Sequence, residues 1–312
     1  LDKEDFETIF YYLHKNYSIS SHPEITLEAN PDDLTPDYIA MLRTLPFNRL
    51  SMGIQTFNES ILKVLQRRHT ARQAIEAFQN CRAAGFQNIS IDLMYGLPGE
   101  TLSTWQQDLD QALLLHPEHL SAYHLIYEED TVLWKLREQH KVEEADEDLS
   151  VSLFSTLIDR LTSEGYDHYE ISNFSLPGLY SRHNSSYWTE KKYLGCGPSA
   201  HSYNGVSRQW NVASLDTYIK GISAGTPVFE IEELDLYTRY NDFVITRIRT
   251  EWGMPLSKLR DEFGEKLYDY CLRMAAPHLK QGTLELVNDI LKLTRKGIFI
   301  SDGIMSDMLW TD

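Results

Sequence analysis

The sequence predicts an α/β protein: an incomplete TIM-like barrel of parallel strands and helices, followed by a small α+β domain. Two observations carry this prediction. Five short strand-like segments alternate with helical patterns, at intervals too long for hairpins, which favours parallel strands joined by helical crossovers. After residue 234 the pattern changes to helices followed by a short alternating pair, which indicates a separate module.

The elements follow in order along the chain. Alternating apolar residues bounded by turn residues predict strands at 24–30, 49–57, 88–94, 119–127 and 167–173. Helical patterns cover 36–45, 58–66, 70–84, 103–115 and 143–163. Thr35 and Pro36 are typical of a helix start, and Gly85 and Gly165 are typical of helix ends.

The strands place polar or small residues where a packed barrel would have bulky ones. One face of the first three strands is apolar, and the opposite face carries Thr26, Glu28 and Asn30, then Ser51, Gly53 and Gln55, then Ser90, Asp92 and Met94. Bulky branched residues fill the interior of an ordinary eight-stranded barrel, so this lining indicates a wider or incomplete barrel that holds a polar ligand. Glu28, Gln55 and Asp92 lie toward the carboxyl ends of their strands, where such folds place their sites.

The last part of the chain resembles a winged-helix module. Helices are expected at 238–250, 255–262 and 266–280, and a hairpin at 284–287 and 290–293 turns at Asn288 and Asp289. We therefore divide the chain into residues 1–234 and 235–312. The second part carries 11 basic and 12 acidic side chains, which argues against a DNA-reading role.

The composition of the chain limits the classes of molecule that it can bind and the cellular location that it suits. The 312 residues are 42% hydrophobic, enough for a large core, and the net charge of −17 would repel nucleic acid and anionic lipid. Cys81, Cys196 and Cys271 are too scattered for a disulfide framework or a metal motif, which favours a reducing, cytoplasmic location. No apolar run reaches membrane-spanning length. Because Leu1 begins directly within a helical pattern, we expect the natural start to lie upstream.

Two features near the polar lumen are further candidates, and each has a plain structural alternative. The segment 95–99, Tyr-Gly-Leu-Pro-Gly, follows the Asp92 strand and would let a ligand approach the backbone, although an ordinary turn needs nothing more. Arg67 ends a helix after the Gln55 strand and is a candidate anion ligand, although helix-end arginines usually face solvent.

The hexad His183-Asn184-Ser185-Ser186-Tyr187-Trp188 is the clearest candidate ligand motif, and we assign residues 175–205 to the region of this motif. An imidazole beside two large aromatic rings suits a flat, apolar ligand with a central metal, with His183 as the metal ligand. A histidine in a loop is more often exposed or structurally bonded, so both interpretations stay open. The small residues of 195–201 indicate a loop of close backbone approach, in which we treat Cys196 as structural and leave His201 unassigned.

The segments 27–31, 49–57, 91–99 and 120–123 resemble the oxygen-independent coproporphyrinogen oxidase family of radical S-adenosylmethionine (SAM) proteins. The hexad and the loop after it resemble the branch described as radical SAM haem chaperones, in which an HNxxYW motif is the proposed haem site. The resemblance implies a partial (β/α)6 barrel that holds a [4Fe-4S] cluster and SAM. It places SAM contacts at Glu28, Gln55, Arg67, Asp92 and Ile126, and haem contacts at His183, Tyr187 and Trp188.

The sequence departs from this family at one point. The family's CxxxCxxC cluster loop and its GGTP stretch have no counterpart here, and we expect both to lie before Leu1. Three thiolates hold such a cluster, and three scattered cysteines cannot replace them. Residues 1–312 are therefore expected to bind no cluster and to perform no radical chemistry, while the intact protein does.

The preferred hypothesis is a haem chaperone that binds haem and hands it to apoproteins. The first alternative is a coproporphyrinogen oxidase, in which a SAM-derived radical oxidatively decarboxylates porphyrin propionates. The second is an unrelated (β/α) enzyme with a polar lumen. An exposed strand edge favours pairing with another copy, which predicts a homodimer formed through that edge.

Overall fold

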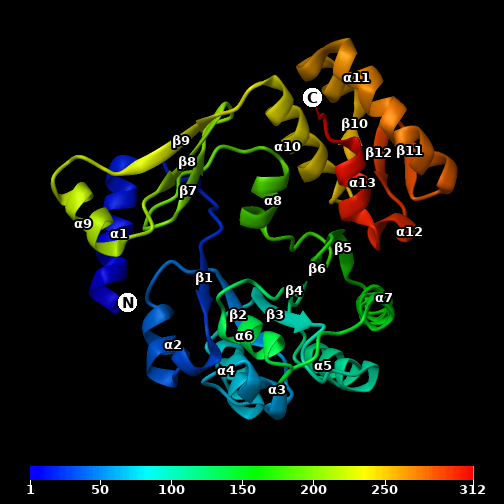
Figure 1. Ribbon diagram of the computed structural model, residues 1–312. Helices are drawn as coiled ribbons and strands as arrows, with labels where there is room; N and C mark the ends of the chain where they lie inside the picture. The colour runs from blue at the N-terminus through cyan, green and yellow to red at the C-terminus, as the bar shows by residue number, and fades with distance from the viewer. Residues whose placement is uncertain (312) are drawn as a thin grey trace. The chain divides into compact units, whose positions relative to one another are not determined.

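The computed structural model describes residues 1–311 and shows two compact units, Leu1–Tyr180 and Ser181–Asp312 (Figure 1). The division falls earlier than residue 234. That position lies inside the second unit, between its first sheet and the helix α10 (Leu236–Ile248).

The first unit is a six-stranded sheet with helical crossovers. Its strands are β1 (Thr26–Ala29), β2 (Arg49–Gln55), β3 (Ile89–Tyr95), β4 (His119–His124), β5 (Asp167–Glu170) and β6 (Asn173–Ser175). Its helices are α1 (Lys3–Asn16), the 3-10 turn η1 (Pro31–Asp33), α2 (Pro36–Leu42), α3 (Glu59–Val64), α4 (Ala71–Ala83), α5 (Leu102–Leu114), α6 (Val132–Glu138) and α7 (Glu147–Ser163). The sheet order is β1-β2-β3-β4-β6-β5, and β1 to β4 are parallel, as predicted.

The predicted strand 167–173 is two strands in the structure. The Glu170 carboxylate accepts hydrogen bonds from the Ser172 backbone N–H and from the Asn173 amide, which turns the chain after β5. β6 then returns antiparallel to both β5 and β4. The alternation in the sequence continues through this turn, so it gave no sign of the reversal. The result is an open mixed sheet at this end of the unit.

The crossover helices begin where their capping residues predict. The side chains of Thr35, Asn58, Thr70 and Thr101 each accept a backbone N–H of the first turn. The apolar faces bury large side chains, including Phe78 and Trp105, against the apolar side of the sheet. The opposite, polar side of β1 to β3 is thereby left for a site. Helix α6 lies in a segment for which the sequence predicted no element; its Leu133 and Trp134 pack against a cluster that includes Leu97 and Tyr127.

The second unit begins with the short helix α8 (Arg182–Trp188) and a three-stranded antiparallel sheet. The sheet consists of β7 (His201–Tyr203), β8 (Ser207–Asn211) and β9 (Phe229–Glu233), with α9 (Leu215–Ser223) between the last two strands. The sequence did not predict this sheet. No residue of β7 or β8 is fully buried and β9 is exposed throughout, so the inside–outside alternation that identifies a strand is weak.

The C-terminal part of this unit follows the prediction closely. After α10 come β10 (Met254–Pro255), α11 (Leu256–Gln281), β11 (Leu284–Val287), β12 (Ile290–Leu293), α12 (Arg295–Ile298) and α13 (Ser301–Met308). The predicted hairpin is present, and Asn288 and Asp289 both have positive φ at its turn. The two predicted helices, 255–262 and 266–280, meet at Gly264, whose φ of 79° breaks the helical path.

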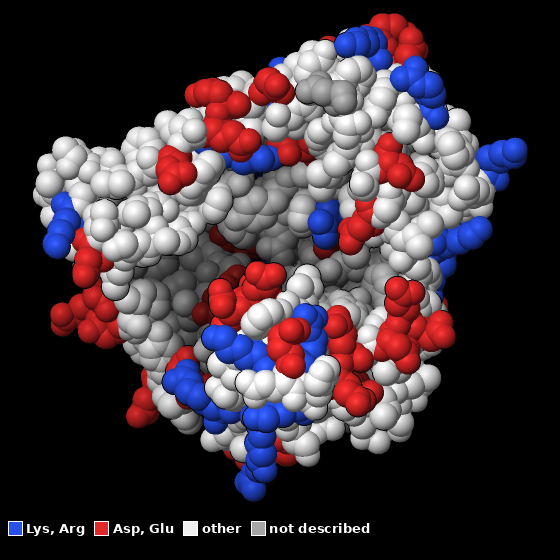
Figure 2. All heavy atoms as spheres, viewed as in Figure 1, with Lys and Arg blue, Asp and Glu red and all other residues white. Residues whose placement is uncertain are grey.

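The surface carries charges of both signs. On the face drawn in Figure 2, blue basic side chains are interspersed with red acidic ones. No helix among residues 1–311 is long and apolar enough to span a membrane.

Candidate functional site

A polar hollow lies on the inner side of the first unit's sheet, at the carboxyl ends of β1 to β3. Its volume is about 320 Å³, and it is lined by Glu28, Ala29, Asn30, Asp33, Ser51, Gly53, Gln55 and Asp92. The structure thus brings together Glu28, Gln55 and Asp92, which the sequence placed on three separate strands. Three of the lining side chains are carboxylates, so the hollow suits a ligand that presents positive charge or hydroxyl groups.

Asp92 is the most enclosed carboxylate of the hollow. The Ser51 hydroxyl lies 3.2 Å and 3.3 Å from its two carboxylate oxygens, and Ser121 of β4 also hydrogen-bonds to it. Burial and the nearby Glu28 charge together raise the pKa of Asp92 to about 6, against the lowering effect of the two serines. Asp92 can therefore take up or release a proton near neutral pH, and a bound cation would favour its charged form.

Gln55 enters the hollow from a strained backbone position. Its φ is 71°, which is uncommon for a residue other than glycine, and the register of β2 against β3 shifts between Gly53 and Gln55. Asp108 of α5 secures the turn that follows: its carboxylate accepts the Thr56 hydroxyl at 2.5 Å and the Phe57 backbone N–H at 2.9 Å. Asp108 thus positions Gln55 from behind the sheet.

Asp108 is a residue that sequence reasoning missed. It is 4% exposed and lies on the apolar face of α5 with Trp105, Leu109 and Ala112. A carboxylate on the buried face of an amphipathic helix needs hydrogen-bond donors, which is the signal that could have identified it. Burial raises the pKa of Asp108 to about 6.

Tyr123 near the end of β4 was also missed as a site residue, although its segment was noted for its resemblance. It is 42% exposed. The pKa of Tyr123 is raised by burial and by the charges of Asp92, Glu170 and Glu28. The phenol therefore stays protonated and can donate a hydrogen bond toward these carboxylates or a ligand near them.

Arg67 reaches the hollow from the segment that follows α3. Its Nη2 donates to the Asn30 side-chain oxygen at 2.7 Å and to the Gly53 carbonyl at 2.6 Å, and both partners line the hollow. Burial lowers the pKa of Arg67, although the group stays charged at neutral pH. The predicted helix-end arginine is thus a structural link between β1 and β2 and a positive charge beside the hollow.

Ile126 and the segment 95–99 lie outside the lining residues. Ile126 follows the end of β4 and is 75% exposed. Gly96 and Leu97 both donate their backbone N–H groups to the Glu100 carboxylate, at 2.7 Å and 3.2 Å. Gly96 has a φ of 72°, and a Cβ there would lie 2.6 Å from the His124 ring, so the turn requires glycine.

The hexad forms most of α8 in the second unit, whereas the sequence had placed it in a loop. Ser181 caps this helix by accepting the Asn184 backbone N–H, and its position before the hexad was the available signal. Four positions apart on one turn, the Tyr187 hydroxyl lies 2.9 Å from His183 Nε2, with the rings edge to face at 5.0 Å. The His183 side chain is exposed, and Tyr187 is 37% exposed.

Trp188 faces a different neighbour. The Arg249 guanidinium lies 4.2 Å from the centre of its indole ring, a cation–π contact that ties α8 to the end of α10. The indole N–H of Trp188 is buried without a hydrogen-bond partner among residues 1–311. Tyr187 instead packs edge to face against Tyr193 at 4.8 Å. The two aromatic rings of the hexad are therefore directed to different surroundings.

The glycine-rich loop after α8 is a region of close backbone approach, as predicted. A Cβ on Gly195 would lie 2.1 Å from the His201 carbonyl oxygen. The Asn211 amide donates to the Gly197 carbonyl at 2.9 Å. Cys196 is exposed, and His201 begins β7 with its ring stacked on Trp210 at 5.9 Å. These contacts describe a structural loop.

The cysteines do not form a cluster site. Cys81 lies buried in α4, Cys271 lies buried in α11, and Cys196 is on the glycine-rich loop. Burial raises the pKa of the Cys81 thiol to about 12 and that of Cys271 to about 11, so both stay protonated. Within residues 1–311 no three histidine, cysteine or acidic side chains are arranged to hold a metal ion. The residues present do not fit a [4Fe-4S] cluster.

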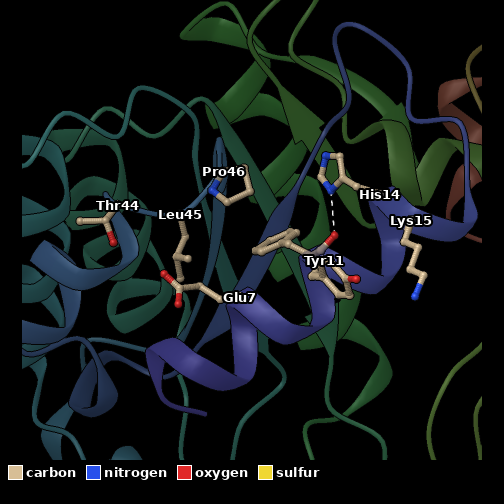
Figure 3. A pocket seen from close by; sticks show the side chains of 8 residues that line it. Glu7, Tyr11, His14, Lys15, Thr44, Leu45 and Pro46 are labelled. Carbon is tan, nitrogen blue, oxygen red and sulfur yellow. Dashed lines mark hydrogen bonds between the residues drawn. The ribbon is translucent and has the colours of Figure 1, made fainter.

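A second hollow lies beside α1 (Figure 3). Its sides are the helix, through residues such as Glu7, Tyr11 and Lys15, and the Thr44–Pro46 segment after α2. The figure shows Glu7 beside Leu45, and His14 hydrogen-bonds within its own helix. No group in this hollow has the enclosure of Asp92, so we take the polar hollow and α8 as the two candidate sites.

Two family models match parts of this chain. The model of the radical SAM superfamily matches residues 1–112, and that of the HemN C-terminal domain matches residues 234–300. The solved structure of coproporphyrinogen III oxidase (HemN) from Escherichia coli aligns with a TM-score of 0.83 at 22% identity. The alignment covers 99% of this chain and 74% of that protein. This likeness shows the fold.

Sequence relatives extend over the whole chain. The heme chaperone HemW of Lactococcus lactis is 30% identical over 315 residues, which cover 100% of this chain and 82% of that protein. The heme chaperone HemW of Bacillus subtilis is 30% identical over 311 residues, with 99% and 82% covered. The mitochondrial radical S-adenosyl methionine domain-containing protein 1 of Bos taurus is 28% identical over 305 residues, with 92% and 67% covered.

Proposed function

Because this chain belongs to the HemW family of radical SAM proteins, we propose that it binds haem at α8 and passes the haem to apoproteins. The observation that carries the proposal is the exposed imidazole of His183 beside the Tyr187 phenol, on one turn of α8. Both groups are haem-iron ligands in proteins. Haem is the cargo in this function, and its porphyrin leaves without chemical change.

The polar hollow is the proposed SAM site. SAM carries a sulfonium, an ammonium, a carboxylate and ribose hydroxyls. Asp92 and Glu28 can accept hydrogen bonds from the ammonium or the hydroxyls, and Gln55 offers an amide. Arg67, which already contacts Asn30 and Gly53, provides the positive charge that a carboxylate requires. Ile126 is exposed and would contact SAM only at the rim of the site.

The side chains described in this chain take no part in the iron–sulfur chemistry of the family. A [4Fe-4S] cluster supplies the electron that cleaves SAM in radical SAM proteins, and the side chains described here do not provide its ligands. For the residues described here we therefore propose the binding of SAM and of haem, and we route no step through the cluster. A cytoplasmic location and a homodimer stay predictions.

Haemin titration tests the chaperone proposal. We expect a saturable, one-to-one Soret shift for the chain, which a variant with both His183→Ala and Tyr187→Phe loses. His201→Ala with Tyr12→Phe is the matched control, because it removes an exposed imidazole and an exposed phenol elsewhere. Identical titrations of the three proteins would refute binding at α8. Transfer is then measured as the haem content of a haem-free b-type apoprotein after mixing and separation.

The alternative function is a coproporphyrinogen oxidase, which the fold likeness to the Escherichia coli enzyme keeps open. The polar hollow serves both functions and does not distinguish them. The fate of the porphyrin does, and it is measured in a preparation extended upstream to supply a cluster loop. Stoichiometric haem recovered unchanged supports the chaperone. A vinyl-bearing product formed from coproporphyrinogen over many turnovers supports the oxidase.

A further inference from the structure

His183 and Tyr187 are hydrogen-bonded to each other through the same two atoms that could bind haem iron. The hydrogen bond joins the Tyr187 hydroxyl oxygen to His183 Nε2 over 2.9 Å, and these are the two atoms through which the side chains would bind haem iron. The two rings meet edge to face at 5.0 Å, so the contact is a packed arrangement and not a chance approach of two flexible groups. A haem that binds here must therefore choose between them.

Iron binding to His183 and iron binding to Tyr187 have different effects on the hydrogen bond between them. Iron bound to His183 Nε2 requires the Tyr187 hydroxyl to leave, because a single nitrogen lone pair cannot hold both the phenol proton and the metal. Iron bound to the Tyr187 oxygen keeps the contact, because the oxygen has further lone pairs and His183 Nε2 can take the phenol proton. The second arrangement uses the geometry as it stands.

We propose that Tyr187 is the iron ligand for ferric haem and that His183 is the base that accepts its proton. This inference rests on the proposed haem function and specifies the chemistry of the α8 site. The Tyr187 O–H bond breaks, the Fe–O bond forms, and a water leaves the iron. The proton moves to His183 Nε2, and the iron stays ferric throughout. The imidazolium then donates a hydrogen bond to the phenolate oxygen, which stabilises it.

The surroundings of Tyr187 support a ligand role. Tyr193 packs edge to face against its ring at 4.8 Å and is itself held by paired backbone hydrogen bonds to Tyr203, at 3.0 Å and 2.9 Å. The Tyr187 ring is therefore fixed on one side by Tyr193 and on another by His183. Tyr187 is nevertheless 37% exposed, so a flat ligand can approach it from solvent.

The ligand also suits a protein that must release its cargo. Phenolate is a hard, anionic oxygen ligand, which matches Fe³⁺ better than Fe²⁺. If a one-electron donor reduces the iron, the Fe–O bond weakens, and the proton held on His183 returns to the tyrosine oxygen. The proton of the hydrogen bond that stabilises the ferric complex therefore protonates the tyrosine oxygen when the iron is ferrous, and the haem is released.

Single variants loaded with haemin test the assignment, with their folding checked by circular dichroism. We expect the wild-type ferric complex to show the phenolate-to-iron charge-transfer absorption and the Fe–O stretching signals of resonance Raman spectra. Tyr187→Phe should lose both signals and bind haemin about tenfold more weakly or worse. His183→Gln should keep both signals, because its amide N–H can donate to the phenolate oxygen, but should form the phenolate only at higher pH, because an amide does not accept the phenol proton. Tyr12→Phe removes an exposed phenol elsewhere in the chain and is the matched control, expected to behave as wild type.

Each outcome decides the matter. Phenolate signals that persist in Tyr187→Phe, that vanish in His183→Gln, or that are absent from the wild-type complex overturn the assignment. A wild-type complex with an imidazole signature that only His183→Gln removes would make His183 the ligand and leave the haem function intact. Failure of the wild-type chain to bind haemin in a one-to-one complex would instead refute the proposed function itself. Reduction with dithionite should also weaken haem binding in the wild type, and unchanged affinity would contradict the release step.

Discussion

The Arg67 guanidinium donates to the Asn30 side-chain oxygen over 2.7 Å, although the two residues are 37 positions apart in the chain. The same nitrogen donates to the Gly53 carbonyl, so one arginine joins the end of β1 to the bulged end of β2. This contact shapes one side of the polar hollow. Arg67 is thus a structural residue and a candidate SAM contact at once, and the two roles have to be separated by experiments on its neighbours.

Asp92→Asn tests the proposed SAM site without disturbing its shape. The amide keeps one oxygen for Ser51 but cannot present a negative charge to a cationic ligand. We expect the affinity for SAM to fall about tenfold, and the affinity for haemin to stay unchanged. Isothermal titration with each ligand measures both. Equal loss of the two affinities would indicate misfolding and would leave Asp92 with a structural role.

Asp108→Ala tests the support of the Gln55 turn. The change leaves the buried Thr56 hydroxyl and the Phe57 N–H without their acceptor, so we expect a loss of about 2–4 kcal/mol in the free energy of unfolding. SAM affinity should fall as well, because Gln55 loses its fixed position. Denaturation by urea and SAM titration measure the two effects. Asp110→Ala on the exposed face of the same helix is the control; if it behaves like Asp108→Ala, the turn contacts are not the cause.

Glu100→Gln tests a pH dependence of stability. Burial raises the pKa of Glu100 to about 7 in the folded protein, above its ordinary value. As the pH rises toward 7, Glu100 loses its proton in the unfolded chain before it does so in the folded protein. The contribution of Glu100 to the free energy of unfolding is therefore fully present at acidic pH and is lost as the pH rises through 7. We expect the wild type to lose about 1–3 kcal/mol more than Glu100→Gln between pH 4.5 and 8. Urea unfolding at both pH values measures this, and parallel pH curves would contradict it.

Trp188→Ala tests whether the indole serves packing or haem binding. The ring carries the Arg249 guanidinium on one face and ties α8 to α10, so we expect a stability loss on the order of 3 kcal/mol. Trp188→Phe keeps an aromatic face for Arg249 and should recover much of this loss. Haemin affinity measured well below the unfolding transition separates the roles. If the affinity falls in both variants while stability is kept in Trp188→Phe, the indole contacts haem.

Much of the first unit follows from local patterns. Strand alternation identified the face on which Glu28, Gln55 and Asp92 lie, and Thr35 with Pro36 indicated where a helix begins. These features depend on neighbours within about one or two turns of chain, which a single sequence displays directly. The hairpin at Asn288 and Asp289 was predictable for the same reason.

Other features depend on side-chain contacts that the hydrophobic alternation of the sequence does not display. The reversal between β5 and β6 required the Glu170 carboxylate to find Ser172 and Asn173, and the sheet of β7 to β9 has too little burial to show a pattern. The hexad was expected in a loop because its polar residues show no apolar helical periodicity, although Ser181 caps a helix there. At the β5–β6 turn and at α8, side-chain hydrogen bonds decide the backbone path, whereas the sheet of β7 to β9 lacks the burial that produces a hydrophobic pattern.

The amino-acid sequence alone specified the family, the parallel strands and the polar face of the sheet, because periodicity and motif order are properties of the chain itself. Only the tertiary structure decided that Asp108 supports Gln55 from behind the sheet, that Arg67 joins two strands, and that Tyr187 and Trp188 face different neighbours. These arrangements arise from contacts between segments up to 61 positions apart, such as Trp188 and Arg249. Such contacts form only when the packed backbone brings a donor and its acceptor, or a cation and a ring, to within a few ångströms.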